Sequence, residues 1–323
     1  MLPPELSDLP PNGWLLIGLA LFLVTLILAR AQFGLRVGRP MTRRERSEAM
    51  VAAAVFAGGL WGAPAWWFGA EGSFPIALDP QTGRFLAAAA AVFALAALIT
   101  LIRPTRQRMR YLMMMLLLYL GPLAAALIVW HREALDWSEP AAWGFALAMV
   151  LLIPGALLGL LLPAGLCKAV DVRPPSRGAR MILGLAGLGA WAWGLGLYIL
   201  PAGPLPELWL WQGDPLVSRL MASGLFALAG AALIGAFAGR HSATALFLVI
   251  LWGAGLALAV QPEYQAGDPL PWVWVGVWAG LAVLAAIQLM IGANRRFRAP
   301  DPEPEPEREA APERSAGAQP TPA

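Results

Sequence analysis

The chain has very few residues that could carry redox or metal chemistry. It holds one cysteine, Cys167, and two histidines, His131 and His241. A single cysteine excludes a disulfide within the chain and any cysteine-based metal cluster. The two histidines fall on opposite sides of the expected bilayer, so they cannot share one metal ion or one haem. We therefore expect no metal site and no cofactor.

Charged residues are also scarce. Asp, Glu, Lys and Arg make up 13% of the 323 residues, whereas a soluble domain averages roughly 25%. None of them falls in the middle of an expected span, which argues against a proton- or sodium-coupled transporter of the ordinary type. The chain also lacks a phosphate loop, a dinucleotide fingerprint, a nucleophile elbow and a zinc-binding helix motif. A catalytic centre of the soluble type is therefore not expected.

What the chain has in abundance is apolar sequence, since 59% of its residues are hydrophobic. A membrane span needs about 20 mostly apolar residues, and inside a bilayer the backbone must satisfy its own hydrogen bonds, so such spans are helices. The predicted spans are 14–29, 49–69, 85–102, 111–130, 141–166, 181–200, 218–238, 244–261 and 271–293. The sequence therefore predicts an all-α, polytopic transmembrane helical bundle of nine spans.

The distribution of basic residues predicts the orientation. Nearly all of them fall in the links at 30–48, 103–110, 168–180 and 239–243 and in the segment after 293, while acidic residues dominate the opposite side. The positive-inside rule puts the basic side in the cytoplasm. We expect an amino terminus outside the cytoplasm and a carboxyl terminus inside it. The strong preference for Arg over Lys indicates a GC-rich bacterial genome, and hence the bacterial inner membrane.

Two terminal segments differ from the spans. The amino-terminal segment is short and acidic and lacks the basic residues that begin a signal peptide, so we expect it to be retained. Residues 299–323 consist mainly of Pro, Glu and Ala without apolar periodicity. Such a segment cannot bury enough surface to fold alone, which predicts a disordered cytoplasmic tail.

An internal duplication is the most informative pattern. The segment DPQTGRFLAAAAAVFALAALI at 79–99 aligns with DPLVSRLMASGLFALAGAALI at 214–234, an offset of 135 residues. The same offset pairs Trp137 with Trp272 and Trp143 with Trp278. Alanine matches between apolar helices arise easily, but the shared D-P-x-x-x-R motif and the tryptophan pairing do not.

The duplication predicts a division of the chain into four parts. Residues 1–48 hold the first helix and a basic loop, 49–167 and 168–298 are four-helix units, and 299–323 is the tail. Each unit begins at the cytoplasm and crosses the membrane an even number of times. The two repeats are therefore parallel, with a pseudo-two-fold axis along the membrane normal, as in some transporters.

The shared motif has a structural and a functional interpretation. Asp is a favoured helix N-cap and Pro is favoured at the first helical position, so the motif marks a helix start. The arginine one turn later can reach lipid headgroups, its own Asp or the other unit. Alternatively, the two arginines face each other across the pseudo-axis and bind an anion, such as a lipid phosphate or a carboxylate. The candidate ligand-binding residues are Arg84, Arg219, Asp79, Asp214, Trp137 and Trp272.

Aromatic and small residues add two further expectations. Many of the 15 tryptophans lie near the outer interface, where an aromatic belt or a lined outer groove accounts for them. The stretch GLAGLGAWAWGLG at 184–196 has closely spaced small residues suited to tight helix packing.

Three functions remain open, in order of preference. The first is a permease-like carrier of an uncharged, apolar or lipid-like molecule, which a continuous cavity between the units would favour. The second is a non-catalytic subunit or assembly scaffold, which flat small-residue faces without a cavity would favour. The third is a lipid-handling enzyme with an outer-face site around Asp136, Glu139, Glu207 and the two arginines. We expect membrane lipids and other membrane proteins as partners, and no nucleic acid, because topology explains the basic loops.

Overall fold

The computed structural model describes residues 11–70, 73–162, 175–200, 214–238, 241–260 and 270–297. The predictions for the amino-terminal segment, Cys167, Glu207 and the tail at 299–323 lie outside these residues. Within them every regular element is a helix and no strand occurs. Nine helices of the described chain are long and apolar enough to cross a membrane. The predicted all-α fold is confirmed, and the helices fit a multi-pass membrane protein.

The helices follow the predicted spans closely. They are α2 (Pro11–Val37), α3 (Arg43–Trp67), α4 (Pro80–Ile102), α5 (Arg106–Ala124), α6 (Pro140–Leu161), α7 (Arg177–Ile199), α8 (Pro215–Phe237), α9 (Ser242–Ala259) and α10 (Leu270–Phe297). α5 continues as a π-helix, η1 (Ala125–Trp130), and a short 3₁₀ turn, η2 (Arg132–Ala134), follows.

The main boundary difference concerns the loop predicted at 30–48, which shrinks to 38–42. α2 runs to Val37, and α3 begins at Arg43. α3 starts there because Thr42 and Glu45 form a capping box, each side chain accepting a backbone N–H of the other residue. Glu45 and Glu48 are consequently buried helical residues and not loop residues.

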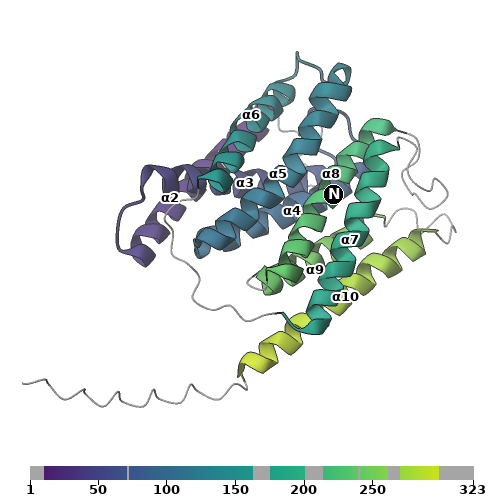
Figure 1. Ribbon diagram of the computed structural model, residues 1–323. Helices are drawn as coiled ribbons and strands as arrows, with labels where there is room; N and C mark the ends of the chain where they lie inside the picture. The colour runs from purple at the N-terminus through teal and green to yellow at the C-terminus, as the bar shows by residue number, and fades with distance from the viewer. Residues whose placement is uncertain are drawn as a thin grey trace, which may run out of the picture.

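α4 and α8 form the centre of the bundle. In their apolar windows 72% and 83% of the residues are buried, against 17% in α2, α6 and α10. α3 packs on α4 and α7 packs on α8, while α5 packs on α8 and α9 packs on α4. Figure 1 shows α2 and α6 at one edge of the bundle and α10 at the opposite edge, with α4, α5 and α8 between them. The two helices that begin with the D-P-x-x-x-R motif are thus the most buried ones.

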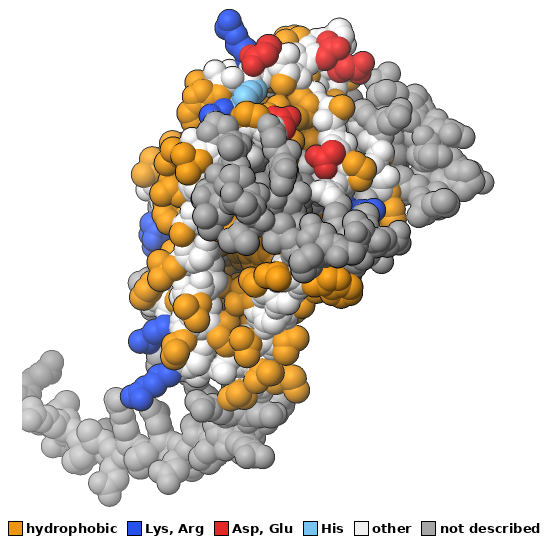
Figure 2. Space-filling view, turned by 90° about the vertical axis from the view of Figure 1, so that its right-hand side faces the viewer, with side chains coloured by type: hydrophobic (Ala, Val, Ile, Leu, Met, Phe, Trp, Pro, Cys, Tyr) orange, Lys and Arg blue, Asp and Glu red, His pale blue; other side chains and the backbone are white. Residues whose placement is uncertain are grey.

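Charge separates the two ends of the bundle. We call the end where α4 and α8 begin, at Asp79 and Asp214, the Asp-Pro end. The opposite end, where α4 ends and α5 begins with Arg106, is called the basic end. Figure 2 shows acidic side chains gathered at one end and apolar side chains along the flank. This distribution suits a protein whose flanks face lipid.

Several features recur at the predicted offset. α4 and α8 each have 23 residues, and their first residues, Pro80 and Pro215, are 135 positions apart. Gly59 and Gly194 have the same offset, and both lie where the helix before the motif meets the motif helix. A Cβ on Gly59 would lie 2.5 Å from the Ala90 carbonyl oxygen, and one on Gly194 would lie 3.2 Å from the Cβ of Leu225. These matches support the predicted repeat, whose arrangement stays a prediction.

Candidate functional site

The two aspartates of the repeated motif are helix caps. Asp79 Oδ1 accepts hydrogen bonds from the backbone N–H groups of Gln81 and Thr82, at 3.0 and 2.9 Å, and its other carboxylate oxygen accepts from the Thr82 hydroxyl. Asp214 Oδ1 accepts from the Leu216 N–H at 2.8 Å. Both carboxylates satisfy N–H groups that have no partner within the helix. The structural interpretation of the Asp-Pro pair therefore agrees with the geometry.

Arg219 has partners from other helices. Its Nη1 lies 2.6 Å from His131 Nε2, and its Nε donates to the Tyr198 carbonyl oxygen at 3.4 Å. The guanidinium carbon lies 4.8 Å from the centre of the Trp130 ring. Because a guanidinium can only donate, His131 Nε2 is the acceptor in this contact. We call Arg219, His131, Trp130 and Tyr198 the Arg219 cluster.

The Arg219 cluster joins the two predicted units at the Asp-Pro end. Tyr198, on α7, also donates its hydroxyl to the Pro122 carbonyl oxygen at 2.9 Å, and its ring packs edge-on against Trp130 at 5.2 Å. Trp130 and His131 lie at the end of η1, and π-helical turns of this kind often occur at functional sites. The cluster thus ties α7 and α8 to the end of α5.

Sequence reasoning missed the partners of Arg219. The repeat led us to compare Arg219 with Arg84, whereas His131 and Tyr198 have no polar counterparts at the offset positions, which are Ala266 and Ala63. Because neither side chain is repeated at the offset position, comparison of the two repeats could not reveal these contacts. One sequence feature did point to these contacts: His131, one of only two histidines, follows Trp130 at the end of a predicted span.

Arg84 differs from its counterpart. Its side chain is half-buried, and its Nε and Nη1 atoms are buried without a hydrogen-bond partner among the described residues. Its own Asp79 is engaged with Gln81 and Thr82. In the described chain no residue forms a hydrogen bond or an ion pair with both arginines, so a shared site between Arg84 and Arg219 stays a prediction.

The predicted tryptophan pairs are in unlike surroundings. Trp137 and Trp272 are 41% and 58% exposed. Trp143 packs edge-on against Trp137 at 5.2 Å and donates its indole N–H to the Trp137 carbonyl oxygen. Its offset partner, Trp278, is buried. The exposed tryptophans suit an aromatic belt, while the buried one contributes to the core.

Among the described residues, neither Asp136 nor Glu139 forms an ion pair or a hydrogen bond with Arg84 or Arg219. Asp136 is exposed and accepts hydrogen bonds from the Ser138 hydroxyl and backbone N–H, which lower the pKa of Asp136. Glu139 is the N-cap of α6, without a hydrogen bond from its side chain to the helix. In the described part of the chain no group of His, Cys, Asp and Glu side chains could hold a metal ion.

The interface between the two predicted units is filled by side chains. Phe93 of α4 meets Trp252 of α9 at 6.3 Å between ring centres, and a Cβ on Gly224 of α8 would lie 3.1 Å from the Phe85 ring. Trp252 and Phe85 are fully buried. Towards the basic end, the Tyr111 hydroxyl donates to the Ala231 carbonyl oxygen at 3.0 Å. Cross-unit hydrogen bonds therefore occur at both ends of a closely packed interface.

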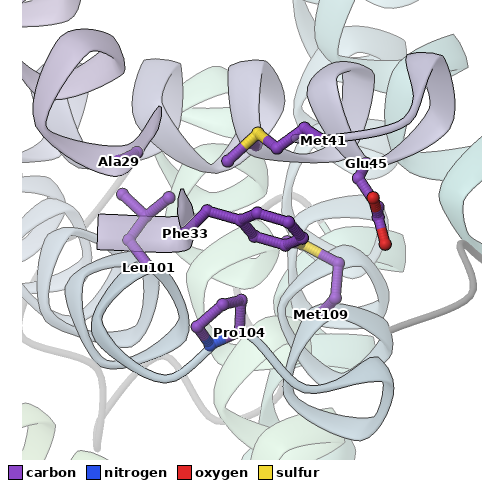
Figure 3. Close-up of a pocket in the computed structure, with 8 residues that line it drawn as sticks. Ala29, Phe33, Met41, Glu45, Leu101, Pro104 and Met109 are labelled. Atoms are coloured by element: carbon purple, nitrogen blue, oxygen red, sulfur yellow. The ribbon is translucent and has the colours of Figure 1, made fainter. Parts of the chain in front are cut away.

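A small cavity lies at the basic end, away from this interface. Its volume is about 10 Å³, which is close to the minimum needed for one water molecule. Figure 3 shows the Phe33 ring of α2 between Met41, Pro104 and Met109. Glu45 at its edge accepts two hydrogen bonds from Arg39, at 2.7 and 2.9 Å. The cavity is too small for a substrate and marks where α2 packs on α3.

No protein-family model, curated protein or solved structure matches this chain. The fold class therefore stands on the helices themselves. A more specific activity has to be argued from the contacts and exposed faces described above.

Proposed function

We propose that the chain is a non-catalytic subunit or assembly scaffold of a membrane protein complex, which binds a transmembrane helix of its partner along α7. In this proposal the protein consists of one helix followed by two parallel four-helix units. It lies in the bacterial inner membrane with its amino terminus outside and its carboxyl terminus in the cytoplasm. The observation that carries the proposal is a difference between α3 and α7.

One row of α3 residues is covered by α2. The row repeats every four residues and consists of Glu45, Ala49, Ala53, Ala57 and Trp61. Its first four members are 2%, 5%, 0% and 2% exposed. Phe33 of α2 lines the same cavity as Glu45 and Ala49, and Gly18 of α2 lies close to the Trp61 side chain. Residues four apart form a row that winds slowly along the helix surface, and α2 packs on α3, so α2 covers this row.

The corresponding row of α7 has no such cover. Its members, 135 residues later, are Arg180, Gly184, Leu188, Ala192 and Gly196. All are exposed or half-buried. Leu188 is 62% exposed, whereas Ala53 at the equivalent position is fully buried, and a Cβ on Gly184 would meet nothing within 4 Å. The second unit thus exposes the face that α2 covers in the first unit.

The composition of this row fits a helix as its occupant. Gly184, Ala192 and Gly196 let another backbone approach closely, as at many interfaces between membrane helices. The α3 row begins with Glu45, which is paired with Arg39. The α7 row begins with Arg180, so we expect an acidic residue near that end of the partner helix.

The filled interface supports a scaffold over a carrier. Alternating access requires one unit to move against the other around a site. Here fully buried aromatic side chains fill the interface, and hydrogen bonds such as Tyr111 to Ala231 and Tyr198 to Pro122 cross it. A carrier would have to break these buried contacts in every cycle, whereas a scaffold keeps them.

Photo-crosslinking in native membranes tests the proposal. A photoreactive amino acid replaces Leu188 or Ala192 on the α7 row, and Leu147 of α6, which is 59% exposed, serves as the matched control. We expect the α7 positions to crosslink one membrane protein of defined mass and the α6 position to crosslink only lipid. Crosslinks to lipid alone at all positions contradict the proposal. Crosslinks to a second copy of this chain would show that the α7 row is a homodimer interface, and would contradict a different protein as the partner.

A second pair of variants tests whether the crosslinked partner uses this face. Gly184→Phe should remove the partner at unchanged protein stability, because open space surrounds Gly184. Gly34→Phe is the control, since Gly34 also has open space around it but lies on α2. Equal loss of the partner in both variants would argue against a defined row.

A further inference from the structure

Arg84 presents buried donors that nothing in the described chain satisfies. Its Nε and Nη1 atoms are shielded from solvent and have no hydrogen-bond partner. A guanidinium is always charged and carries five N–H donors. Leaving such donors buried and unpaired is costly. A ligand with acceptor oxygens would remove that cost.

The comparison with Arg219 shows what is missing. Around Arg219, His131 Nε2 and the Tyr198 carbonyl oxygen accept hydrogen bonds, and the Tyr198 side chain fills the space beside Trp130. At the offset positions for Arg84 the sequence has Ala63 for Tyr198 and Ala266 for His131. Under the proposed repeat, the sequence therefore keeps the arginine as Arg84 but has alanines at both positions equivalent to the large side chains around Arg219.

The depth of Arg84 points to a lipid phosphate. α4 has 23 residues, which rise about 34 Å, slightly more than the hydrocarbon core of about 30 Å. Arg84 is about 6 Å along the axis from Pro80, so its side chain reaches the headgroup region. The carboxylate nearest in sequence, Asp79, is already used as the N-cap. In the headgroup region, a phospholipid phosphate offers acceptor oxygens that match the donors of an arginine.

We infer that Arg84 binds the phosphate group of one membrane phospholipid at the Asp-Pro end of α4, and that Arg219 binds none because its Nε and Nη1 already have acceptors in Tyr198 and His131. This inference separates two residues that the repeated motif makes look alike. It does not depend on whether α7 binds a partner helix, so the two proposals fail independently.

Native mass spectrometry of the full chain tests the inference. The protein is purified in mild detergent and titrated with phosphatidylglycerol, with diacylglycerol of the same chains, and separately with inorganic phosphate. We expect one tightly bound phosphatidylglycerol and no equivalent binding of diacylglycerol. Arg84→Gln should weaken the lipid binding about tenfold or more, since a hydrogen bond to a charged group is lost. Arg219→Gln should keep the wild-type lipid affinity.

The contrary outcomes are equally definite. Unchanged lipid binding in Arg84→Gln, or equal losses in both glutamine variants, overturns the inference. Inorganic phosphate that competes with the lipid at equal affinity overturns the assignment to a lipid. If Arg84→Gln does not fold, Arg84→Lys takes its place. Because Lys keeps the charge but loses the planar fork, it should bind the lipid more weakly than the wild type, and wild-type affinity would contradict the proposed contact.

Discussion

Two neighbouring glycines of α3 allow a sharp test of the helix packing. Gly59 faces α4, and a Cβ there would lie 2.5 Å from the Ala90 carbonyl oxygen, 2.9 Å from the Ala94 nitrogen and 3.0 Å from the Ala94 Cβ. Two of these atoms are backbone, so no side-chain rotation relieves the clash. A Cβ on Gly58 would meet nothing within 4 Å. One methyl group should therefore have opposite effects at adjacent positions.

The expected magnitudes follow from two opposing contributions. Replacing Gly by Ala inside a helix is worth about 0.8–1 kcal/mol in intrinsic propensity, and this gain applies to both positions. At Gly59 the helices must separate, and overpacking of this kind typically costs about 1–3 kcal/mol. Gly58→Ala should stabilise the protein slightly. Gly59→Ala should be less stable than Gly58→Ala by about 1–3 kcal/mol, because the propensity gain cancels in the difference.

The assay is reversible unfolding in mixed micelles with increasing SDS, followed by tryptophan fluorescence. The order of midpoints should be Gly58→Ala, then wild type, then Gly59→Ala. If Gly59→Ala were as stable as Gly58→Ala, α3 and α4 would not be in the close contact described, and the reasoning about this pair would be refuted.

Three further predictions concern the caps, the Arg219 cluster and the topology. Asp79→Ala should lower the free energy of unfolding by about 0.5–2 kcal/mol through loss of the N-cap, while Glu139→Ala, at an N-cap without a side-chain bond, should stay within about 0.5 kcal/mol in the same SDS assay. Equal effects would show that the Asp79 cap adds nothing. Tyr198→Phe should cost about 1 kcal/mol, because only the hydrogen bond to Pro122 is lost while the ring contacts remain; a loss above about 3 kcal/mol would mean that the ring contacts are also disrupted. A reporter fused after residue 298 should read out as cytoplasmic under the positive-inside rule, and an extracytoplasmic signal would contradict the proposed orientation.

The helices were predictable because their signal is local. Long apolar runs force helices in a bilayer, and the Asp-Pro pairs placed the starts of α4 and α8 at Pro80 and Pro215, where the structure has them. The loop at 30–48 was predicted too long because its charges hid a capping box at Thr42 and Glu45. The charged residues of this segment indicate where the chain leaves the membrane. They do not indicate where α2 ends or α3 begins, because both helices continue into the charged sequence.

The surroundings of the two arginines were not predictable in the same way. The repeat makes Arg84 and Arg219 equivalent, but tertiary contacts decide what each one meets. Arg219 meets His131 and Tyr198, which are 88 and 21 residues away in sequence and have alanines at their offset positions. Likewise, Leu188 is exposed whereas Ala53 is buried, and α2, which packs on α3, has no counterpart in the predicted duplication. Contacts of this kind differ between the two predicted repeats, so the repeat pattern alone does not predict them.

The most direct test of the central claim is a distance between the two units. Ile102 and Phe237 are the last residues of α4 and α8, stand 135 positions apart, and are 44% and 79% exposed. With Cys167 replaced by Ser, spin labels at these two positions report the distance by double electron–electron resonance in liposomes. A scaffold with a fixed interface predicts one narrow distance distribution that is the same in detergent and in liposomes of different composition. Two populations that exchange with conditions would show moving units and would contradict the account in favour of a carrier.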